Sequence, residues 1–134
     1  MPAQIAEPVR QFLEEPNVAV LATQFPSNRL QTTPVWFLYA DGQILINTSK
    51  GRAKLRNIDA HREVALAIVD AQNPYRYVQI QGKVVAIDPK SGARDIDRLS
   101  QRYLGKPYAY SANDRPENRV TILIEPQRVS AQGL

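Results

Sequence analysis

The stretch that decides the fold reads Asp-Gly-Gln-Ile-Leu-Ile-Asn-Thr-Ser-Lys-Gly-Arg-Ala-Lys-Leu-Arg-Asn, residues 41–57. Its first two residues, Asp41-Gly42, are typical of a tight hairpin turn in which both central positions need a positive φ. The β-type residues after them, through Thr48, predict a strand that pairs with the strand before the turn. From residue 50 the alternation stops, which predicts a helix over about 50–60, capped by the hydroxyl of Thr48 or Ser49.

Strand signals also dominate on both sides of this stretch. The apolar and alternating runs predict strands over 17–25, 30–39, 44–48, 63–69, 76–87 and 119–125, and helices over 8–15, 50–60 and 89–104. Gly82, in mid-strand, indicates a bulge or a close backbone approach. Short turns join most strands, whereas a parallel sheet needs a crossover helix between nearly every pair. We therefore predict a mainly β fold, an antiparallel barrel of about six strands with a few short helices.

Composition limits the class of protein. With 134 residues, of which 43% are hydrophobic, the chain fits one domain, residues 1–134. There is no cysteine, which excludes disulfides, iron–sulfur clusters, thiolate zinc sites and cysteine nucleophiles. The first residues lack a basic start followed by an apolar run, and no apolar stretch is long enough to span a bilayer. We expect a soluble, cytoplasmic protein without a membrane partner.

The positive charge of the chain is concentrated in one place. The formal net charge is +4, and four cations without an intervening acid follow the predicted strand: Lys50, Arg52, Lys54 and Arg56. On a helix, Lys50 stacks on Lys54 and Arg52 on Arg56, on either side of an apolar face. With Ser49 at the helix N-terminus, this arrangement is typical of a phosphate clamp. The alternative is a run of solvated surface cations.

Two aromatic segments allow a second function besides packing. Pro34-Val35-Trp36-Phe37 holds the only tryptophan, and neighbouring side chains there point to opposite faces, so Val35 and Trp36 do not share one core. The segment is either a core strand or a backbone ledge against a planar heterocycle. In 73–77, Tyr75 and Tyr77 flank Arg76, and Gln79 follows on the Tyr77 face. These side chains either cover a sheet edge or reach the ligand of a neighbouring subunit.

Side-chain sets for catalysis and metal binding are missing from the sequence. His61 is the only histidine, and it has neither metal-ligand spacing nor a Ser/His/Asp order around it. No glycine-rich nucleotide fingerprint or P-loop occurs. We therefore predict no catalytic side chain and no metal, and any reaction must use the chemistry of a cofactor.

Taken in order, these segments resemble a known family. They are residues 17–23, 33–37, 41–42, 46–48, 51–57 and 73–77, followed by 97–99, 102–105 and 120–126. The chain resembles the pyridoxamine 5'-phosphate oxidase-like superfamily and, within it, the reductases that depend on the deazaflavin coenzyme F420. The resemblance implies a six-stranded split β-barrel that forms a homodimer with two cofactor sites at the interface.

The resemblance also implies which residues bind the cofactor. The backbone of the ledge faces the flavin ring: Pro34, Val35, Trp36 and Phe37. The ring and its ribityl chain contact Asn47, Thr48 and Ser49. The phosphate contacts Arg52, Lys54 and Arg56, and Lys50 suits the polyanionic tail of coenzyme F420. The partner chain contributes Tyr75, Arg76, Tyr77 and Gln79.

The implied function is hydride transfer between reduced coenzyme F420 and a small, electron-poor organic acceptor. Three alternatives stay open: an FMN-binding oxidoreductase of the same fold, a non-enzymatic F420 carrier or sensor, and a nucleic-acid binder. The last is disfavoured because aromatic and basic residues are not interleaved on one sheet face. True pyridoxamine 5'-phosphate oxidases grip the substrate phosphate with a C-terminal segment that bears arginine and tryptophan. No such segment follows Glu125-Pro126, so the resemblance does not imply vitamin B6 oxidation.

Overall fold

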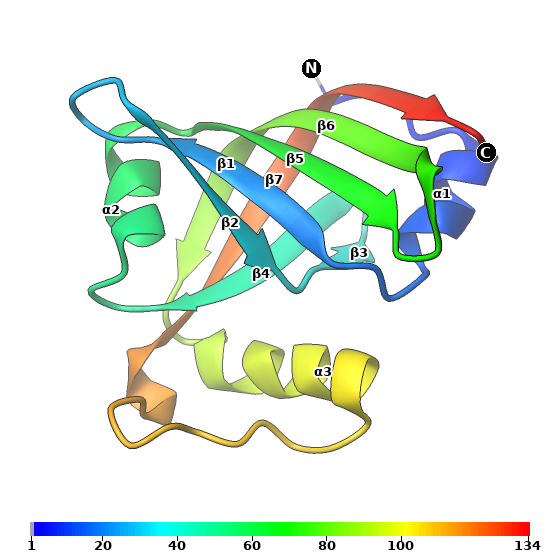
Figure 1. Ribbon diagram of the computed structural model, residues 1–134. Coiled ribbons are helices and arrows are strands. Elements are labelled where there is room, and N and C mark those ends of the chain that lie inside the picture. Colours follow the sequence, from blue (N-terminus) through cyan, green and yellow to red (C-terminus); the bar gives the residue numbers. More distant parts are fainter. Residues whose placement is uncertain (1) are drawn as a thin grey trace.

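Residues 2–134 are described by a computed structural model, in which a curled sheet carries three helices on its outside (Figure 1). The strands are β1 (Ala19–Gln24), β2 (Leu30–Val35), β3 (Leu38–Ala40), β4 (Gln43–Ser49), β5 (Glu63–Asp70), β6 (Asn73–Asp88) and β7 (Arg119–Gln132). The helices are α1 (Glu7–Leu13), α2 (Ala53–Ala60) and α3 (Gly92–Leu104), with a 3-10 helix, η1, at Pro116–Asn118. None of the helices in this part of the chain is long and apolar enough to cross a membrane.

The order of the strands explains why the sheet closes. All seven described strands form one antiparallel sheet, in the order β2-β1-β5-β6-β7-β4-β3. β2 and β3 stand at the two ends of this order, yet only Trp36 and Phe37 separate them in the chain. The sheet therefore curls until its edges meet, which gives a barrel with a seam between β2 and β3 (Figure 1). This confirms the predicted mainly β fold and antiparallel split barrel.

The strand count is seven rather than six, because the strand predicted over 30–39 breaks at Phe37. The Phe37 N–H donates to the Tyr103 hydroxyl (3.2 Å), and the Phe37 carbonyl accepts from Arg102 (2.6 Å). Side chains of α3 thus satisfy this backbone in place of a neighbouring strand, and the ladder stops. The prediction for the side chains is confirmed: Val35 packs in the barrel core, and Trp36 packs against α3.

The predicted hairpin turn is confirmed at Asp41 and Gly42, which have φ of 53° and 77°. It joins β3 to β4 with Ala40 opposite Gln43. The bulge predicted at Gly82 is confirmed as well, because the β6–β7 register shifts between Gln81 and Gly82. A Cβ on Gly82 would lie only 2.7 Å from the Ile124 side chain, so the two strands approach closely there.

Two of the predicted helices begin later than expected. α2 begins at Ala53 and has no side-chain cap, because Thr48 and Ser49 stay in β4, opposite Val120 and Arg119. The predicted cap is therefore wrong, and Lys50 lies before the helix rather than stacked on Lys54 along it.

In the same way, the helix predicted over 89–104 begins not at Pro89 but at Gly92. The Asp88 carboxylate accepts from Lys90 N–H and the Ser91 hydroxyl, which holds the residues before the helix in a turn. α1, predicted over 8–15, has a proline in its first turn and ends at Leu13. β6 begins at Asn73, so Pro74 lies inside the strand, and β7 continues to Gln132, beyond the predicted end.

Two apolar clusters hold the molecule together. The larger one fills the barrel and includes Phe12, Phe37 and Ile58, none of which is exposed. Burial of each such side chain contributes about 1.5–3 kcal/mol. The smaller cluster joins α3 to the outside of the barrel through Leu45 and Leu99. This second cluster places α3 and the loop after it beside the ends of β2 and β4.

Candidate functional site

A groove of about 410 Å³ lies where β2 and β4 end, between α2 and α3. Seven of the residues predicted to bind a cofactor line it: Pro34, Val35, Trp36, Asn47, Thr48, Arg52 and Lys54. Five residues that were not predicted complete the lining: Val18, Ile96, Leu99, Tyr108 and Arg119. No Asp, Glu or His side chain of the described residues lines the groove, so all of its formal charge is positive.

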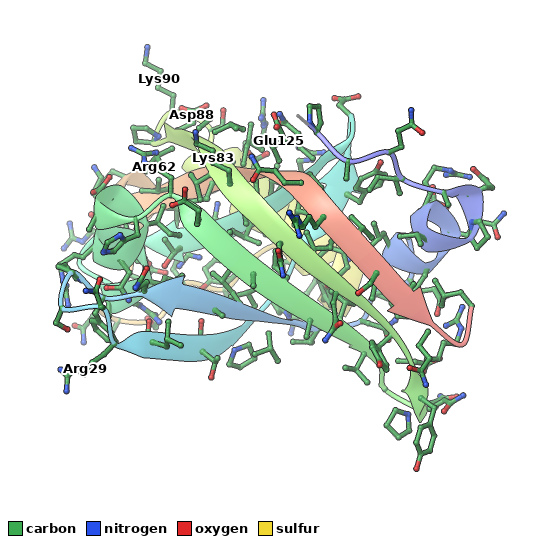
Figure 2. All side chains as sticks on the ribbon, turned by 90° about the horizontal axis from the view of Figure 1, so that it is seen from above. Arg29, Arg62, Lys83, Asp88, Lys90 and Glu125 are labelled. Carbon is green, nitrogen blue, oxygen red and sulfur yellow. The ribbon has the colours of Figure 1, made fainter. Side chains whose placement is uncertain are left out.

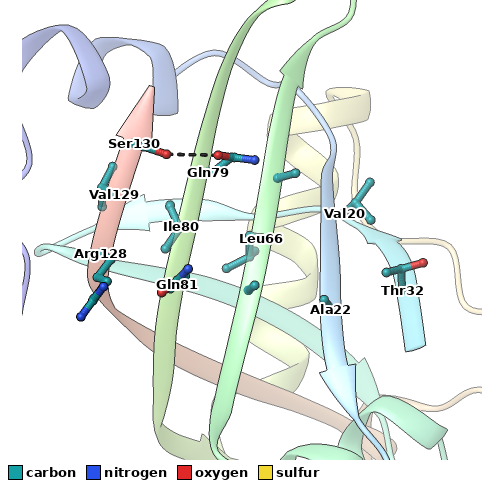
Figure 3. A pocket seen from close by; sticks show the side chains of 12 residues that line it. Val20, Ala22, Thr32, Leu66, Gln79, Ile80, Gln81, Arg128, Val129 and Ser130 are labelled. Atoms are coloured by element: carbon teal, nitrogen blue, oxygen red, sulfur yellow. Dashed lines mark hydrogen bonds between the residues drawn. The ribbon is translucent and has the colours of Figure 1, made fainter. Parts of the chain in front are cut away.

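Two larger hollows, of about 470 and 650 Å³, lie on the outer face of the sheet. Figure 3 shows the first of them, where Gln79, Gln81 and Arg128 lie along β6 and β7. Neither hollow is lined by an aromatic ring, and Arg128 is the one cation among the described residues that line them. The smaller groove, with three cations and two aromatic rings, is therefore the better candidate for an aromatic ligand that carries an anionic group.

The cations of the groove come from three different backbone settings. Arg52 precedes α2 and is exposed, Lys54 lies in the first turn of α2 and is half-buried, and Arg119 begins β7 and is buried. Burial lowers the pKa of Lys54 below its ordinary value, and the charges of Arg52 and Arg119 lower it further. Three like charges thus lie near one another and no carboxylate lines the groove beside them, although Asp114 pairs with Arg119 from outside it. An anion would stabilise this arrangement.

Arg119 is held by side chains of β4 and of the loop before β7. Its Nε donates to Asn47 Oδ1 (2.9 Å), and its Nη1 donates to Ser49 Oγ (2.7 Å) and Asp114 Oδ2 (3.0 Å). The guanidinium carbon lies 5.2 Å from the centre of the Tyr108 ring, which adds a cation–π contact. A buried guanidinium needs such partners, because desolvation without them costs several kcal/mol.

Asn47 connects this cluster to α3. Its amide Nδ2 donates to the Gly92 carbonyl (2.9 Å), while its Oδ1 accepts from Arg119. A Cβ on Gly92 would lie 1.9 Å from the Arg119 carbonyl oxygen, so α3 begins in direct contact with the β7 backbone. The start of α3 and the arginine of the groove therefore depend on each other.

Aromatic rings form the other side of the groove. Trp36 stacks on Tyr103 with ring centres 5.3 Å apart and 7° between the planes, and it meets Tyr108 edge to face at 6.5 Å. Val18, Ile96 and the rings give this side an apolar surface. A groove that is lined by both aromatic rings and cations suits a flat ring with an anionic chain.

Arg102 and Tyr103 fix the backbone beneath the Trp36 ring. Arg102 donates to the carbonyls of Phe37, Leu13 and Glu15, at 2.6 Å for Phe37 and 2.9 Å for the other two. The Tyr103 hydroxyl donates to the Asn17 carbonyl (2.7 Å), and burial raises the pKa of Tyr103. The end of α3 thereby ties together the segment before β1 and the β2–β3 link.

Four other residues predicted to bind the cofactor do not line the groove. Phe37 is fully buried in the barrel core, and its backbone bonds with Arg102 and Tyr103. Ser49 is buried and bonds with Arg119 and Asp114. The remaining two are exposed: Lys50 N–H donates to the Asn118 carbonyl, and Arg56 Nη1 donates to the Gly51 carbonyl.

The residues expected to act from a partner chain lie on β6. Arg76 forms ion pairs with Glu15 (2.6 Å) and Asp70 (3.0 Å) and lies over the Phe12 ring. Tyr75 is 74% exposed. The other two bond to β7: the Tyr77 hydroxyl donates to Gln132, and Gln79 accepts from Ser130 (3.1 Å, Figure 3). Their role in a second subunit's site stays a prediction.

Arg119 and Tyr108 are the main residues that sequence reasoning missed. Tyr108 lies in a polar loop, and no spacing relates it to Trp36, which is distant in the chain. The sequence contains one signal for Arg119. This arginine begins the mostly apolar strand 119–124, and a cation buried at such a position needs hydrogen-bond or charged partners. Those partners come from β4 and the loop before β7, and the strand pairing that joins β4 to β7 was not predicted.

Comparisons with known proteins agree with the barrel fold. The family model described as pyridoxamine 5'-phosphate oxidase matches residues 5–133. A solved structure named F420 reductase is 31% identical, with a TM-score of 0.84 over 94% of this chain and 98% of its own. A conserved hypothetical protein from Mycobacterium tuberculosis is 20% identical, with a TM-score of 0.74 over 98% of this chain and 86% of its own. No curated protein matches the chain.

A further solved structure, the general stress protein 26 of Bacillus anthracis, is 18% identical, with a TM-score of 0.70 over 94% of this chain and 92% of its own. At this identity the similarity concerns the fold alone. The family model, by contrast, covers nearly the whole chain, and the seam between β2 and β3 gives the split barrel that the resemblance implied. The chain therefore belongs to the pyridoxamine 5'-phosphate oxidase family.

Proposed function

We propose that this protein is an oxidoreductase that depends on coenzyme F420 and transfers hydride between the reduced deazaflavin and a small, electron-poor organic acceptor. The observation that carries the proposal is the groove itself, which is lined by two aromatic rings and three cations and by no acid. The similarity to a protein named F420 reductase over 94% of the chain supports the choice of cofactor.

The residues present fit such a cofactor. Arg52 and Lys54 would hold the phosphate, since both line the groove and no carboxylate lines it beside them. Burial first, and then the charges of Arg52 and Arg119, lower the pKa of Lys54, and a bound anion would offset the charge part of this effect. Pro34 and Trp36 would lie along the ring, and Thr48 would contact the ribityl chain. As a proline, residue 34 has no N–H, so of its backbone groups only the carbonyl can hydrogen-bond with the ring.

The cofactor, when bound, supplies a hydride at carbon 5 of its ring. The role of the protein chain is to position the ring and the acceptor and to exclude water. Trp36, Val18 and Ile96 give the ring side of the groove an apolar surface, which favours a flat acceptor over solvent. Orientation of two reactants in one apolar groove lowers the barrier without a protein nucleophile.

Separate titrations of the apoprotein with coenzyme F420 and with FMN test the proposal. We expect the lower dissociation constant for coenzyme F420, followed by oxidation of the reduced cofactor in the presence of a suitable enone or quinone. Tighter binding of FMN would overturn the choice of cofactor. Tight binding of coenzyme F420 without turnover across a broad acceptor panel would instead identify a carrier or sensor.

An FMN-dependent oxidoreductase is the second candidate, and the match to the pyridoxamine 5'-phosphate oxidase family favours it. The same cations suit the FMN phosphate. Purified protein would then show the yellow absorbance of bound FMN and would not respond to added deazaflavin.

A further inference from the structure

We propose that Arg119 is an anion-binding residue of the groove, whose Nη2 binds an oxyanion, a phosphoryl or carboxylate group, in the chain that follows the cofactor ring. This inference deepens the proposed function and rests on it for the identity of the ligand. It adds a binding residue from β7 to the cations of 50–56, which are the ones that the sequence indicated.

The hydrogen bonds of Arg119 leave one nitrogen free. Nε and Nη1 donate to Asn47, Ser49 and Asp114, whereas Nη2 takes part in none of the hydrogen bonds among residues 2–134. The buried side-chain atoms without a partner in this part of the chain are Asn17 Nδ2 and Gln31 Oε1. Arg119 Nη2 is therefore accessible to solvent, although the residue is only 6% exposed. Arg119 is one of the residues that line the groove, so its guanidinium is within reach of a ligand there.

The guanidinium is also held in a fixed orientation. Asn47 on β4, Ser49 on the same strand and Asp114 in the preceding loop constrain two of its three nitrogens, and the Tyr108 ring lies 5.2 Å from its centre. A fixed guanidinium loses little side-chain entropy when it binds, and its charge-assisted hydrogen bonds are about twice as strong as neutral ones.

The carboxylate that balances Arg119 lies outside the groove. Asp114 is 9% exposed, is absent from the groove lining, and accepts from Ser49 Oγ (3.1 Å) and Arg115 N–H (3.0 Å) in addition to Arg119. The groove therefore meets the cation and not its counter-charge. A ligand anion at Nη2 would approach Arg119 from the groove, where no acid lines the surface, while Asp114 stays bonded to Nη1.

Arg119 also lies near the cations of α2. The charge of Arg119 contributes to the lowered pKa of Lys54, as does the charge of Arg52. Asp114 balances one of the three charges, so two remain, which a polyanionic chain such as that of coenzyme F420 would neutralise and an anion of one charge would not. The geometry thus favours the tail of the cofactor over a neutral acceptor as the partner of Arg119.

Arg119→Lys tests the inference, since it keeps the positive charge but removes Nη2, the free nitrogen of the guanidinium. Binding is followed by quenching of the single tryptophan, Trp36, which lines the groove. The probes are coenzyme F420 and the deazaflavin chromophore with its ribityl chain but without phosphate. We expect affinity for coenzyme F420 to fall about tenfold, from loss of a charge-assisted contact, with the phosphate-free chromophore changed less than about twofold.

Arg115→Lys is the matched control, because Arg115 is exposed, lies only four residues before Arg119 and does not line the groove. It should leave both affinities unchanged. Equal losses for both probes in Arg119→Lys would show that Arg119 only shapes the groove and would overturn the inference, as would no loss for either. If Arg119→Lys does not fold, Arg119→Gln takes its place with the same outcomes, since its amide still donates toward Asn47 or Ser49.

Failure of the proposed function gives a different result. If the wild-type protein binds FMN and not coenzyme F420, the cofactor assignment is wrong, and FMN and riboflavin then replace the two probes. A selective loss of FMN affinity in Arg119→Lys, with riboflavin unaffected, would still support an anion contact at Arg119. Equal effects on FMN and riboflavin would overturn it.

Discussion

Lys54 lies half-buried beside two arginines, so its charge responds to pH more readily than that of an exposed lysine. Burial, and then the charges of Arg52 and Arg119, lower its pKa below 10.5. We expect the affinity for coenzyme F420 to be constant near neutral pH and to fall as the pH rises through this lowered pKa, because the neutral amine no longer attracts the anion. Dissociation constants measured between about pH 7 and pH 10 report the change.

Two substitutions assign this fall to Lys54. Lys54→Arg keeps its charge throughout the range and should remove most of the pH dependence, whereas Lys54→Ala should weaken binding about tenfold already at neutral pH. Lys90→Arg is the control, because Lys90 is exposed and projects away from the barrel (Figure 2). An unchanged pH profile in Lys54→Arg would contradict the assignment.

Tyr103 is a second residue whose role, here in stability, can be measured. Its hydroxyl accepts from Phe37 N–H (3.2 Å) and Arg102 (2.9 Å) and donates to the Asn17 carbonyl (2.7 Å). Tyr103→Phe leaves the Phe37 N–H without its partner, so we expect the free energy of unfolding to drop by about 1–3 kcal/mol in chemical denaturation. Tyr75→Phe, at a side chain that is 74% exposed, should change it by less than about 0.5 kcal/mol.

Among the residues of the groove, those that follow the hairpin turn closely in the chain could be predicted from the sequence more readily than those that come from the other side of the barrel. Sequence reasoning indicated Arg52 and Lys54 because they follow an obvious strand and form part of a run of cations. It overestimated how many cations share one helix face, because the start of α2 depends on how far β4 pairs with β7. That pairing, which keeps Ser49 opposite Arg119, joins segments 70 residues apart and leaves no local signal.

At the scale of elements, the contact between α3 and β7 depends on one glycine. A Cβ at residue 92 would meet the Arg119 carbonyl oxygen at 1.9 Å, so Gly92→Ala must push α3 away from the sheet. We expect a loss of about 3 kcal/mol in the free energy of unfolding, the upper part of the range for overpacking. Because Asn47 donates to the Gly92 carbonyl, affinity for the cofactor should fall as well.

Lys90→Ala serves as the control for Gly92→Ala. Lys90 lies in the turn just before α3 but is exposed, so the free energy of unfolding of this variant should stay within about 0.5 kcal/mol of the wild type. Thermal or denaturant unfolding, together with titration of the cofactor, distinguishes the two variants. A Gly92→Ala protein with wild-type stability would mean that α3 can shift freely on the sheet.

The ends of elements were harder to predict than the elements themselves. The run 30–39 is rich in β-type residues throughout, and the break after Val35 comes from Arg102 and Tyr103 of a distant helix. The start of α3 was similar, because Asp88 resembles a cap but holds a turn instead. Local patterns predict strands and helices, and tertiary hydrogen bonds decide where they stop.

At the scale of the whole molecule, the outer face of the sheet leads to a prediction about assembly. Around the hollow of Figure 3 the side chains are small, with Ala22, Ala65 and Ala67 between longer polar ones, and Val20 is 41% exposed. We expect a homodimer, as the family resemblance implies, with a mass in sedimentation of twice the chain mass of 15.1 kDa.

Ala67→Arg tests whether this face of the sheet is the one that packs against the second subunit. A bulky charge there would be buried against a partner without a counter-charge, so the variant should sediment as a monomer. Lys83→Arg on β6, at an exposed side chain that already carries a charge, should leave the mass of the assembly unchanged (Figure 2). A dimer in Ala67→Arg would place the interface elsewhere on the molecule.

The two-residue link between β2 and β3 also has a consequence for the order of folding. The β3–β4 hairpin joins neighbours in the chain and forms early, whereas β4 reaches β7 only by closing a long loop. The seam beside Trp36 takes its final shape only when β1, β5, β6 and β7 are paired between the two edges. Emission of the single tryptophan therefore reports the completion of folding, and after dilution from denaturant it should change later than the far-ultraviolet signal of the strands.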